Sequence, residues 1–277
     1  MNTHHAGWLA HVSLVVVYAV VLCGLLSVTV NAVAAAERAD ESLARKLAEF
    51  PGADRGQTTA ITDPAIAKVF PTHRFYVLRF RQYPVAITPP GPLGSNNLFV
   101  AKPDGSVGHV GDAGALERFF RAALPPVTTA DQAKDVAKAW LRLVEELHQD
   151  GFFQFSIPED AVQAITAPDG ALSVTGKATA TQPSGGPGEI VASLAFDRTG
   201  RLASASETAS LKRGIRPICQ ATKLLDPDPI VRGMAEQALL VMGAAAKGYL
   251  DEVRAGADAK LRQAIDRIWK QIRAEGR

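Results

Sequence analysis

The stretch Asp228-Pro-Ile-Val-Arg-Gly-Met-Ala-Glu-Gln-Ala-Leu-Leu-Val-Met-Gly243 defines the fold of the C-terminal part of the chain. Asp228 is a favourable N-cap, because its carboxylate can accept hydrogen bonds from the unpaired amides of a first helical turn. Pro229 follows at the first helical position, where a missing N–H costs nothing, and Gly243 is typical of a helix C-terminus. The stretch therefore predicts an amphipathic helix, whose apolar stripe consists of Val231, Ala235, Ala238 and Met242.

The same pattern returns 30 residues later, where Asp258 corresponds to Asp228 and Arg262 to Arg232. A second helix is expected between the two copies, over residues 245–255, and another before them, over residues 215–225. None of these helices can bury its apolar face alone, so they are expected to stack on one another. The apolar stripe of the second copy consists of Leu261, Ile265, Ile268, Trp269 and Ile272.

The pattern Asp-Pro-x-Val-Arg-x-x-Ala-x-x-Ala-Leu-x-x-Met-Gly over residues 228–243 resembles a short bacterial HEAT-like repeat. The resemblance covers residues 215–274. It implies a stack of helices that binds another protein, and a few such arrays assist enzymes. Only two copies are found, whereas a free-standing array needs three or more. The tail is therefore expected to lean on the preceding domain.

The 277 residues are enough for two domains, and the hydrophobic content of 47% is ample for their cores. We predict an α+β fold, in which an antiparallel sheet with packed helices precedes a small all-α tail. Residues 64–211 form the α+β domain, either as one unit or as the subdomains 64–126 and 127–211. The four expected parts are a signal peptide or membrane anchor over 1–36, a helix and linker over 37–63, the α+β domain over 64–211, and HEAT-like repeats over 212–277.

Residues 1–36 contain no Asp, Glu, Lys or Arg, and residues 12–30 are nearly all apolar, which predicts an N-terminal apolar helix. Ala32-Val33-Ala34 and Ala34-Ala35-Ala36 are suitable cleavage sites, which favours an export signal. An uncleaved anchor stays open, because about 19 apolar residues can span a bilayer. In either case the remaining chain is expected outside the cytoplasm, as a periplasmic, cell-envelope, secreted or membrane-anchored protein.

The first half of the α+β domain shows local signals for a strand, a hairpin and a short helix. Residues 75–81 alternate in polarity as a strand does. Pro103-Asp104-Gly105 predicts the turn of a hairpin between residues 97–101 and 106–110. Asp112 is expected to cap a helix that ends before Pro125.

The second half begins with Thr129-Ala-Asp-Gln132, a capping box that predicts a helix up to Gly151. Trp140 lies in the middle of its apolar stripe. Strands are expected over 152–155, 172–181, 190–196 and 201–208. A long helix followed by an antiparallel meander is a two-layer α+β arrangement, and its order is similar to the cystatin-like fold. The protease-blocking Gln-x-Val-x-Gly motif of cystatins is missing, so the resemblance does not imply inhibition.

No motif for catalysis, a cofactor or a metal is recognised in the sequence. His73, His109 and His148 are scattered over separate elements and have no metal-ligand spacing. Glu145 and Glu146 adjoin on a helix and are expected to point in different directions rather than to act as a paired acid and base. Cys219 is the only cysteine outside the leader and is expected to be a packing residue.

Two functional hypotheses follow. Residues 212–277 hold 13 Lys and Arg against 8 Asp and Glu, and Lys260, Arg267 and Lys270 share one predicted helix face. This face is either a solvated surface or a docking surface for an acidic protein or anionic headgroups. The first hypothesis is a non-enzymatic envelope protein that contacts a protein partner, and not nucleic acid, through its tail. The alternative is an enzyme whose residues are gathered from distant positions, which a pocket joining a histidine to carboxylates would favour.

Overall fold

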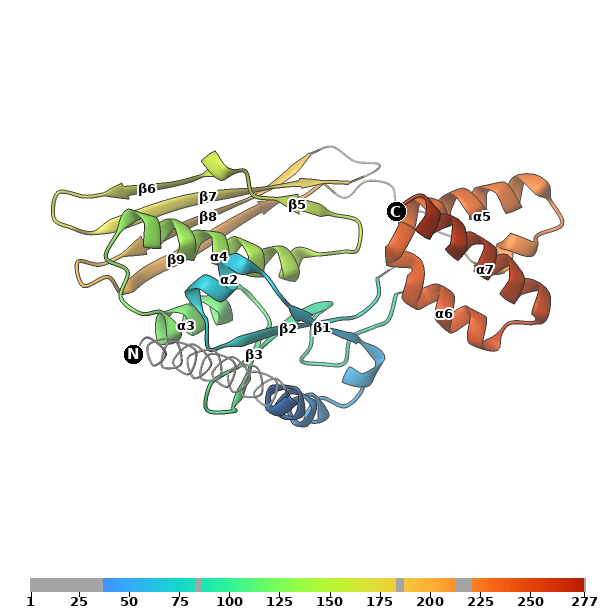
Figure 1. Cartoon of the computed structure of the whole chain (residues 1–277), viewed down its shortest axis with the longest axis horizontal. Coiled ribbons are helices and arrows are strands. Elements are labelled where there is room, and N and C mark those ends of the chain that lie inside the picture. Colours follow the sequence, from blue (N-terminus) through green and yellow to red (C-terminus); the bar gives the residue numbers. More distant parts are fainter. Residues whose placement is uncertain (1–36, 83–85, 183–186, 213–220, 277) are drawn as a thin grey trace, which may run out of the picture.

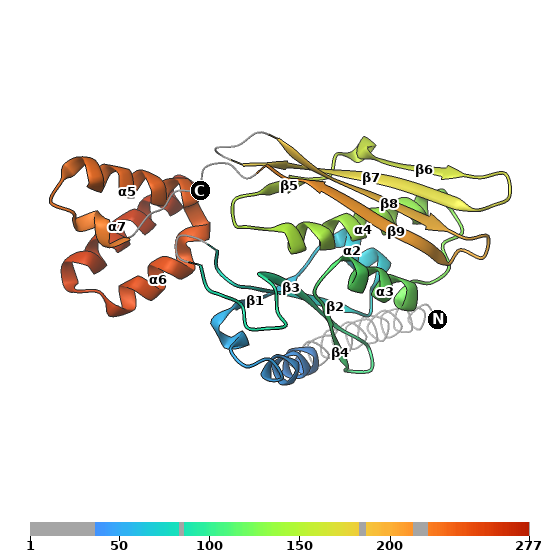
Figure 2. The same ribbon diagram turned by 180° about the vertical axis from the view of Figure 1, so that it is seen from behind.

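We describe the fold from a computed structural model, in which residues 37–82, 86–182, 187–212 and 221–276 are placed. The apolar leader, Cys219 and most of the expected helix 215–225 lie outside these residues. Within the described ranges, no helix has the length and apolar character needed to cross a membrane. From one side to the other, the layers are the helix 37–48, a first sheet, a group of helices, and a second sheet, with the helical tail at one end (Figures 1 and 2).

The first sheet has four antiparallel strands in the order β1-β2-β3-β4. β2 and β3 are buried on both faces, as expected for strands in the middle of a layered domain. The predicted hairpin between β3 and β4 is confirmed: Gly105 has φ 81°, and the Asp104 carboxylate accepts a hydrogen bond of 2.8 Å from the Ser106 amide. The strands are β1 (Gln57–Ile61), β2 (Arg74–Arg79), β3 (Asn96–Ala101) and β4 (Val107–Val110).

The outer face of this sheet is covered by a helix over residues 37–48, which belongs to the predicted helix and linker of residues 37–63. Leu43 is buried against Leu78 and Phe99 of the sheet. The Tyr76 hydroxyl donates a hydrogen bond of 2.6 Å to Asp40, which joins the helix to β2. Burial and this hydrogen bond raise the pKa of Tyr76 to about 12.

The prediction of a linker over residues 51–63 was wrong, because these residues contain the short helix η1 (Ala53–Arg55) and the strand β1. β1 was missed because its sequence, Gln-Thr-Thr-Ala-Ile, shows little alternation. The side chains of its first four residues are exposed and the fifth is half-buried. Pairing with β2, rather than its own pattern, makes this segment a strand.

Three helices form the layer between the sheets: α2 (Pro64–Val69), α3 (Ala113–Ala123) and α4 (Ala130–His148). The Asp112 cap and the Thr129 capping box are confirmed, since both side chains accept hydrogen bonds from the amides of their first turns. α2 was not predicted, although Asp63 and Pro64 begin it as Asp228 and Pro229 begin the tail helix.

The second sheet contains five antiparallel strands in the order β5-β7-β8-β9, with β6 also paired to β7. The expected strand 172–181 is β7, with the same bounds. β6, which follows the short helix η2 (Glu159–Ala161), was not predicted, because it is short and only its first residue is buried. The strands are β5 (Gln154–Ser156), β6 (Val162–Thr166), β7 (Leu172–Thr181), β8 (Gly188–Phe196) and β9 (Leu202–Ser210).

One hydrophobic core joins the two sheets through α4. It contains Phe75 and Leu98 from the first sheet, Trp140 from α4, and Ile190 and Phe196 from the second sheet. The two halves of the α+β domain therefore share a core. The long helix packed on an antiparallel meander agrees with the expected two-layer arrangement for residues 130–210.

Over residues 221–276, the tail contains three α-helices with a core of their own. Asp228 and Asp258 cap α5 and α7 as predicted, and α7 packs against both other helices. Phe152, from the segment between α4 and β5, is buried in the tail core. The elements are η3 (Ala221–Leu225), α5 (Pro229–Met242), η4 (Gly243–Ala246), α6 (Lys247–Gly256) and α7 (Ala259–Ala274).

The tail packs against the α+β domain, as expected because an array of only two copies needs such support. In addition to the contact through Phe152, Arg81, which follows β2, forms an ion pair of 2.5 Å with Glu252 of α6. The Arg81 guanidinium also lies over the Tyr249 ring, 5.5 Å from its centre.

Candidate functional site

A polar cleft of about 240 Å³, here called the inner cleft, lies between α4 and the β1–β2 pair. Its floor consists of residues 59–63 of β1 and the following loop, with Val77 and Arg79 of β2. Its wall is the charged side of α4, formed by Arg142, Glu145 and Glu146. Three carboxyl groups, including that of Asp63, therefore face two guanidinium groups.

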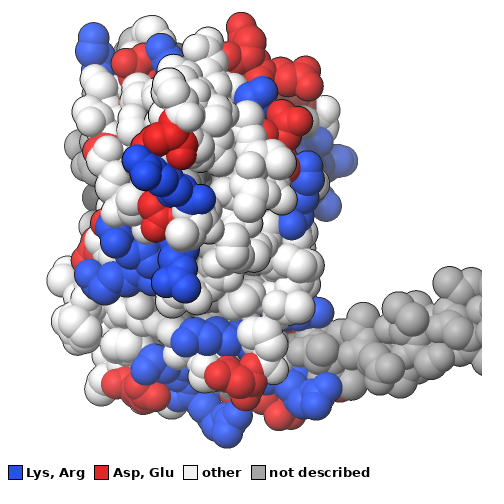
Figure 3. All heavy atoms as spheres, turned by 90° about the vertical axis from the view of Figure 1, so that its left-hand side faces the viewer, with Lys and Arg blue, Asp and Glu red and all other residues white. Residues whose placement is uncertain are grey.

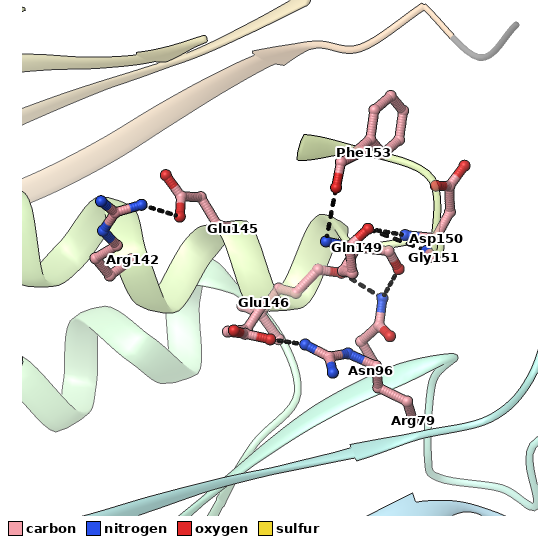
Figure 4. Close-up of polar contacts among 10 residues, drawn as sticks. Arg79, Asn96, Arg142, Glu145, Glu146, Gln149, Asp150, Gly151 and Phe153 are labelled. Carbon is pink, nitrogen blue, oxygen red and sulfur yellow. Dashed lines mark hydrogen bonds and ion pairs between the residues drawn. The ribbon is translucent and has the colours of Figure 1, made fainter. Parts of the chain in front are cut away.

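Ion pairs organise the inner cleft. Arg142 donates to Glu145 at 2.9 Å and lies 3.4 Å from the carboxylate of Asp63. Arg79 is paired with Glu146. Figure 4 shows Glu145 and Glu146 leaving α4 in different directions, each toward a different arginine, as the sequence led us to expect.

Glu145 is the unusual member of this group, because its side chain is only 9% exposed. Its Oε2 binds Arg142, whereas its Oε1 is buried and has no hydrogen-bond partner among the described residues. Burial raises the pKa of Glu145 above its ordinary value, and the bond from Arg142 opposes this effect only in part. A carboxyl group held in this way can exchange a proton when its surroundings change.

We expect Glu145→Gln to stabilise the protein at neutral pH. A carboxyl group whose pKa is higher in the folded chain binds more protons there, so its contribution to stability falls as pH rises. The unfolding free energies of the two proteins should be similar at acidic pH, and the difference should grow as pH rises above the ordinary Glu value of 4.5.

Denaturant unfolding at several pH values measures this difference. Glu159→Gln, which removes an exposed carboxylate, controls for the change in net charge. A Glu145→Gln protein that loses stability relative to the native chain as pH rises would contradict the assigned burial effect.

A second cleft, here called the end cleft, has a volume of about 440 Å³ and lies where α4 ends. Asn96 of β3 holds this end of the helix, because its Nδ2 donates to the carbonyl oxygens of Leu147 at 3.0 Å and Gln149 at 2.6 Å (Figure 4). His148 lines the cleft, and its Nε2 lies 3.1 Å from Oε1 of Glu207 on β9.

His73 and His109 line neither of these two clefts. His73 packs edge-on against Phe70 and Phe119. His109 stacks on Phe99, and burial lowers the pKa of both imidazoles. In the described ranges, no group of three or more His, Cys, Asp or Glu side chains is placed to hold a metal ion.

The three predicted partner-binding residues of the tail, Lys260, Arg267 and Lys270, are all exposed on α7. Arg267 is not available as an isolated cation, since its Nη2 lies 2.5 Å from Oε1 of Glu236 on α5. The neighbouring Asp266 is paired with Arg254 at 2.7 Å. The basic face is therefore interrupted by internal ion pairs.

A second tail surface was not predicted. Ile230, Met234 and Val241 of α5 are 71%, 68% and 39% exposed. Because a helix has 3.6 residues per turn, these positions lie on one face, here called the apolar face. Leu225 of the neighbouring η3 is also exposed, so four of the five exposed large apolar side chains in the described ranges belong to the tail.

The described residues at the end of the molecule opposite the tail present charges of both signs. Figure 3 shows Lys and Arg lying among Asp and Glu over this end. One of the pairs there joins Arg198 to Asp169 across two turns of the second sheet at 2.8 Å. Interspersed charges of this kind are typical of a solvated surface.

Comparisons with protein-family models, curated proteins and solved structures gave no match to this chain. The HEAT-like and cystatin-like resemblances therefore stay predictions that rest on the residues and topology described above.

Proposed function

We propose that the chain is a non-enzymatic interaction protein of the cell envelope, which binds a protein partner through the apolar face of α5. The export or membrane anchoring that this requires rests on the apolar leader, residues 1–36. The α+β domain supports the tail through Phe152 and Arg81, so that α5 is held at one end of the molecule.

The single observation that carries the proposal is the exposure of Ile230 and Met234. Both are large apolar side chains on one helix face and remain more than two-thirds exposed. Apolar residues gathered on a surface are typical of protein interfaces, because their burial releases ordered water. Isolated apolar residues on a surface need no such explanation, but these lie one helical turn apart.

The apolar face and the basic residues of α7 lie on different sides of α5. Glu236, which binds Arg267, is two residues from Met234 and is thus about 160° away round the helix. The two surfaces can therefore be tested separately. The acidic partner expected from Lys260, Arg267 and Lys270 is retained as the subordinate part of the proposal.

The test compares partners captured from native envelopes by three purified proteins: the native chain, the variant Ile230→Ser/Met234→Ser, and the reversal Lys260→Glu/Lys270→Glu. We expect the double serine variant to fold normally, because exposed substitutions usually change stability by less than about 0.5 kcal/mol. It should lose the captured partner. The charge reversal should weaken capture only at low salt, since exposed charges are screened.

A partner retained by the serine variant would refute the apolar face as the binding surface. If only a second copy of this chain is recovered, the apolar face would mediate self-association instead of binding a different protein. Loss of capture only on charge reversal would move the site to α7.

An enzyme is the second candidate, and one observation favours it. His148, which lines the end cleft, lies 3.1 Å from the carboxylate of Glu207, and an enzyme of this kind needs a histidine beside a carboxylate. The pair also ties α4 to β9, which explains it without catalysis. A hydrolytic activity that His148→Gln abolishes while the protein stays folded would favour the enzyme.

A further inference from the structure

β1 forms an open edge of the first sheet, because among the described strands it pairs with β2 alone. Sheet edges offer unpaired N–H and C=O groups to other chains, and proteins usually protect them with charged residues, proline, bulges or a covering element. β1 carries no charged residue and no proline, and its first four side chains are exposed.

The edge of the second sheet at β9, in contrast to the edge at β1, is covered by side chains of α3. Arg121 of α3 donates to the carbonyl oxygen of Ala203 at 2.5 Å. Glu117 of the same helix accepts a hydrogen bond of 3.4 Å from the Ala205 amide. The two side chains therefore satisfy two of the backbone groups with which another strand would pair.

The register shows which backbone groups of β2 point toward β1. The Phe80 amide donates to the Ser95 carbonyl at 2.8 Å, so even-numbered residues of β2 direct their backbone groups toward β3. Successive residues of a strand alternate between its two neighbours. The odd-numbered residues of β2, including Val77, therefore bond to β1.

Val77 is paired with Thr59, so Thr59 directs its N–H and C=O toward β2. The intervening residues, Thr58 and Ala60, must then direct theirs toward the open side. A segment that added beside β1 would find two donors and two acceptors at the spacing of an antiparallel or parallel ladder.

The inner cleft lies on the face of the sheet to which Thr59 and Ile61 contribute. Alternate side chains of an added strand would enter the space between this face and α4. There they would meet three carboxyl groups and two guanidinium groups, a surplus of one carboxyl group. Oε1 of Glu145 has no hydrogen-bond partner among the described residues, as is also true of Nε of Arg79, and the Glu145 side chain is nine-tenths buried.

We propose that the open edge of β1 and the inner cleft bind an extended segment of a partner protein, which adds as a strand and places a Lys or Arg side chain near Glu145. Main-chain hydrogen bonds supply affinity in this mode of recognition, and the side-chain pocket supplies specificity. The site is separate from the apolar face of α5 and does not depend on it.

The test is a selection of displayed random heptapeptides on the purified full chain, followed by fluorescence anisotropy with the enriched peptides. We expect these peptides to alternate β-branched residues and to share one Lys or Arg. Ala60→Pro should lower the affinity for these peptides about fivefold, because it removes one outward N–H without breaking the β1–β2 ladder. The matched control is Ala164→Pro on β6, another strand that pairs with one neighbour only.

Glu145→Gln provides a second variant that leaves the edge intact. It should reduce the preference for a basic residue while retaining part of the binding. Absence of enriched peptides, enrichment without a basic residue, or equal binding to the native chain and Ala60→Pro would each overturn the proposal. Equal losses in Ala60→Pro and Ala164→Pro would also overturn it, because binding would then not be specific to β1.

Discussion

Trp140→Ala is expected to lower the free energy of unfolding by about 3–5 kcal/mol, because it leaves a cavity that the surrounding core cannot fill. Trp140 is fully buried in the core shared by both sheets, and its ring lies 5.0 Å from the centre of the Phe120 ring in an edge-on arrangement. Its loss therefore affects α3, α4 and the packing between the sheets together. Denaturant unfolding followed by circular dichroism measures the effect.

Lys134→Ala is the matched control on the same helix. Lys134 forms only a long surface ion pair of 3.5 Å with Asp131, and such pairs contribute about 0–1 kcal/mol. Equal stabilities for the two variants would show that α4 does not direct Trp140 into the core.

Ile265→Asp is expected to unfold the tail while leaving the α+β domain folded. Ile265 is 2% exposed in the tail core, and an unpaired charge at such a position costs more than about 3 kcal/mol. Hydrogen exchange should show lost protection in α5, α6 and α7 and retained protection in β7 and β8. Gln263→Asp introduces the same residue at an exposed position of α7 and should leave the tail intact.

Loss of protection in both parts after Ile265→Asp would contradict a separate tail core. It would mean that Phe152 and Arg81 couple the two parts into one folding unit. Retained protection throughout would place Ile265 outside the core.

Local signals predicted most helices and turns, because a cap or a turn depends on a few adjacent residues. Asp112, Thr129, Asp228 and Asp258 all occupy the predicted N-caps. Asp63 and Pro64 give the same signal at the start of α2.

Strands β1 and β6 were missed for a different reason. Neither shows strong alternation, and each pairs with the strand that follows it in the chain, β1 with β2 and β6 with β7. Pairing depends on the partner strand as well as on the segment itself, so a short segment with few buried side chains carries little sign of it.

The candidate sites could not be predicted fully either, because local sequence does not show which elements come together. The inner cleft needs β1, β2 and α4 together, so Arg79 and Glu146 could not be paired from the sequence. The positions of Ile230, Met234 and Val241 on one helix face could be read from their spacing. Nothing local shows that this face is exposed while the face of Ala235 and Leu239 is buried, because α5 is apolar on both.

The central claim is that the apolar face of α5 contacts a partner, and site-specific photocrosslinking in living cells tests it most directly. A photoreactive phenylalanine derivative placed at Met234 should form a crosslink to a second protein, whereas the same group at Glu159, which is exposed on η2, should not. A crosslink from Glu159 alone, or the same crosslinks from both positions, would contradict the claim.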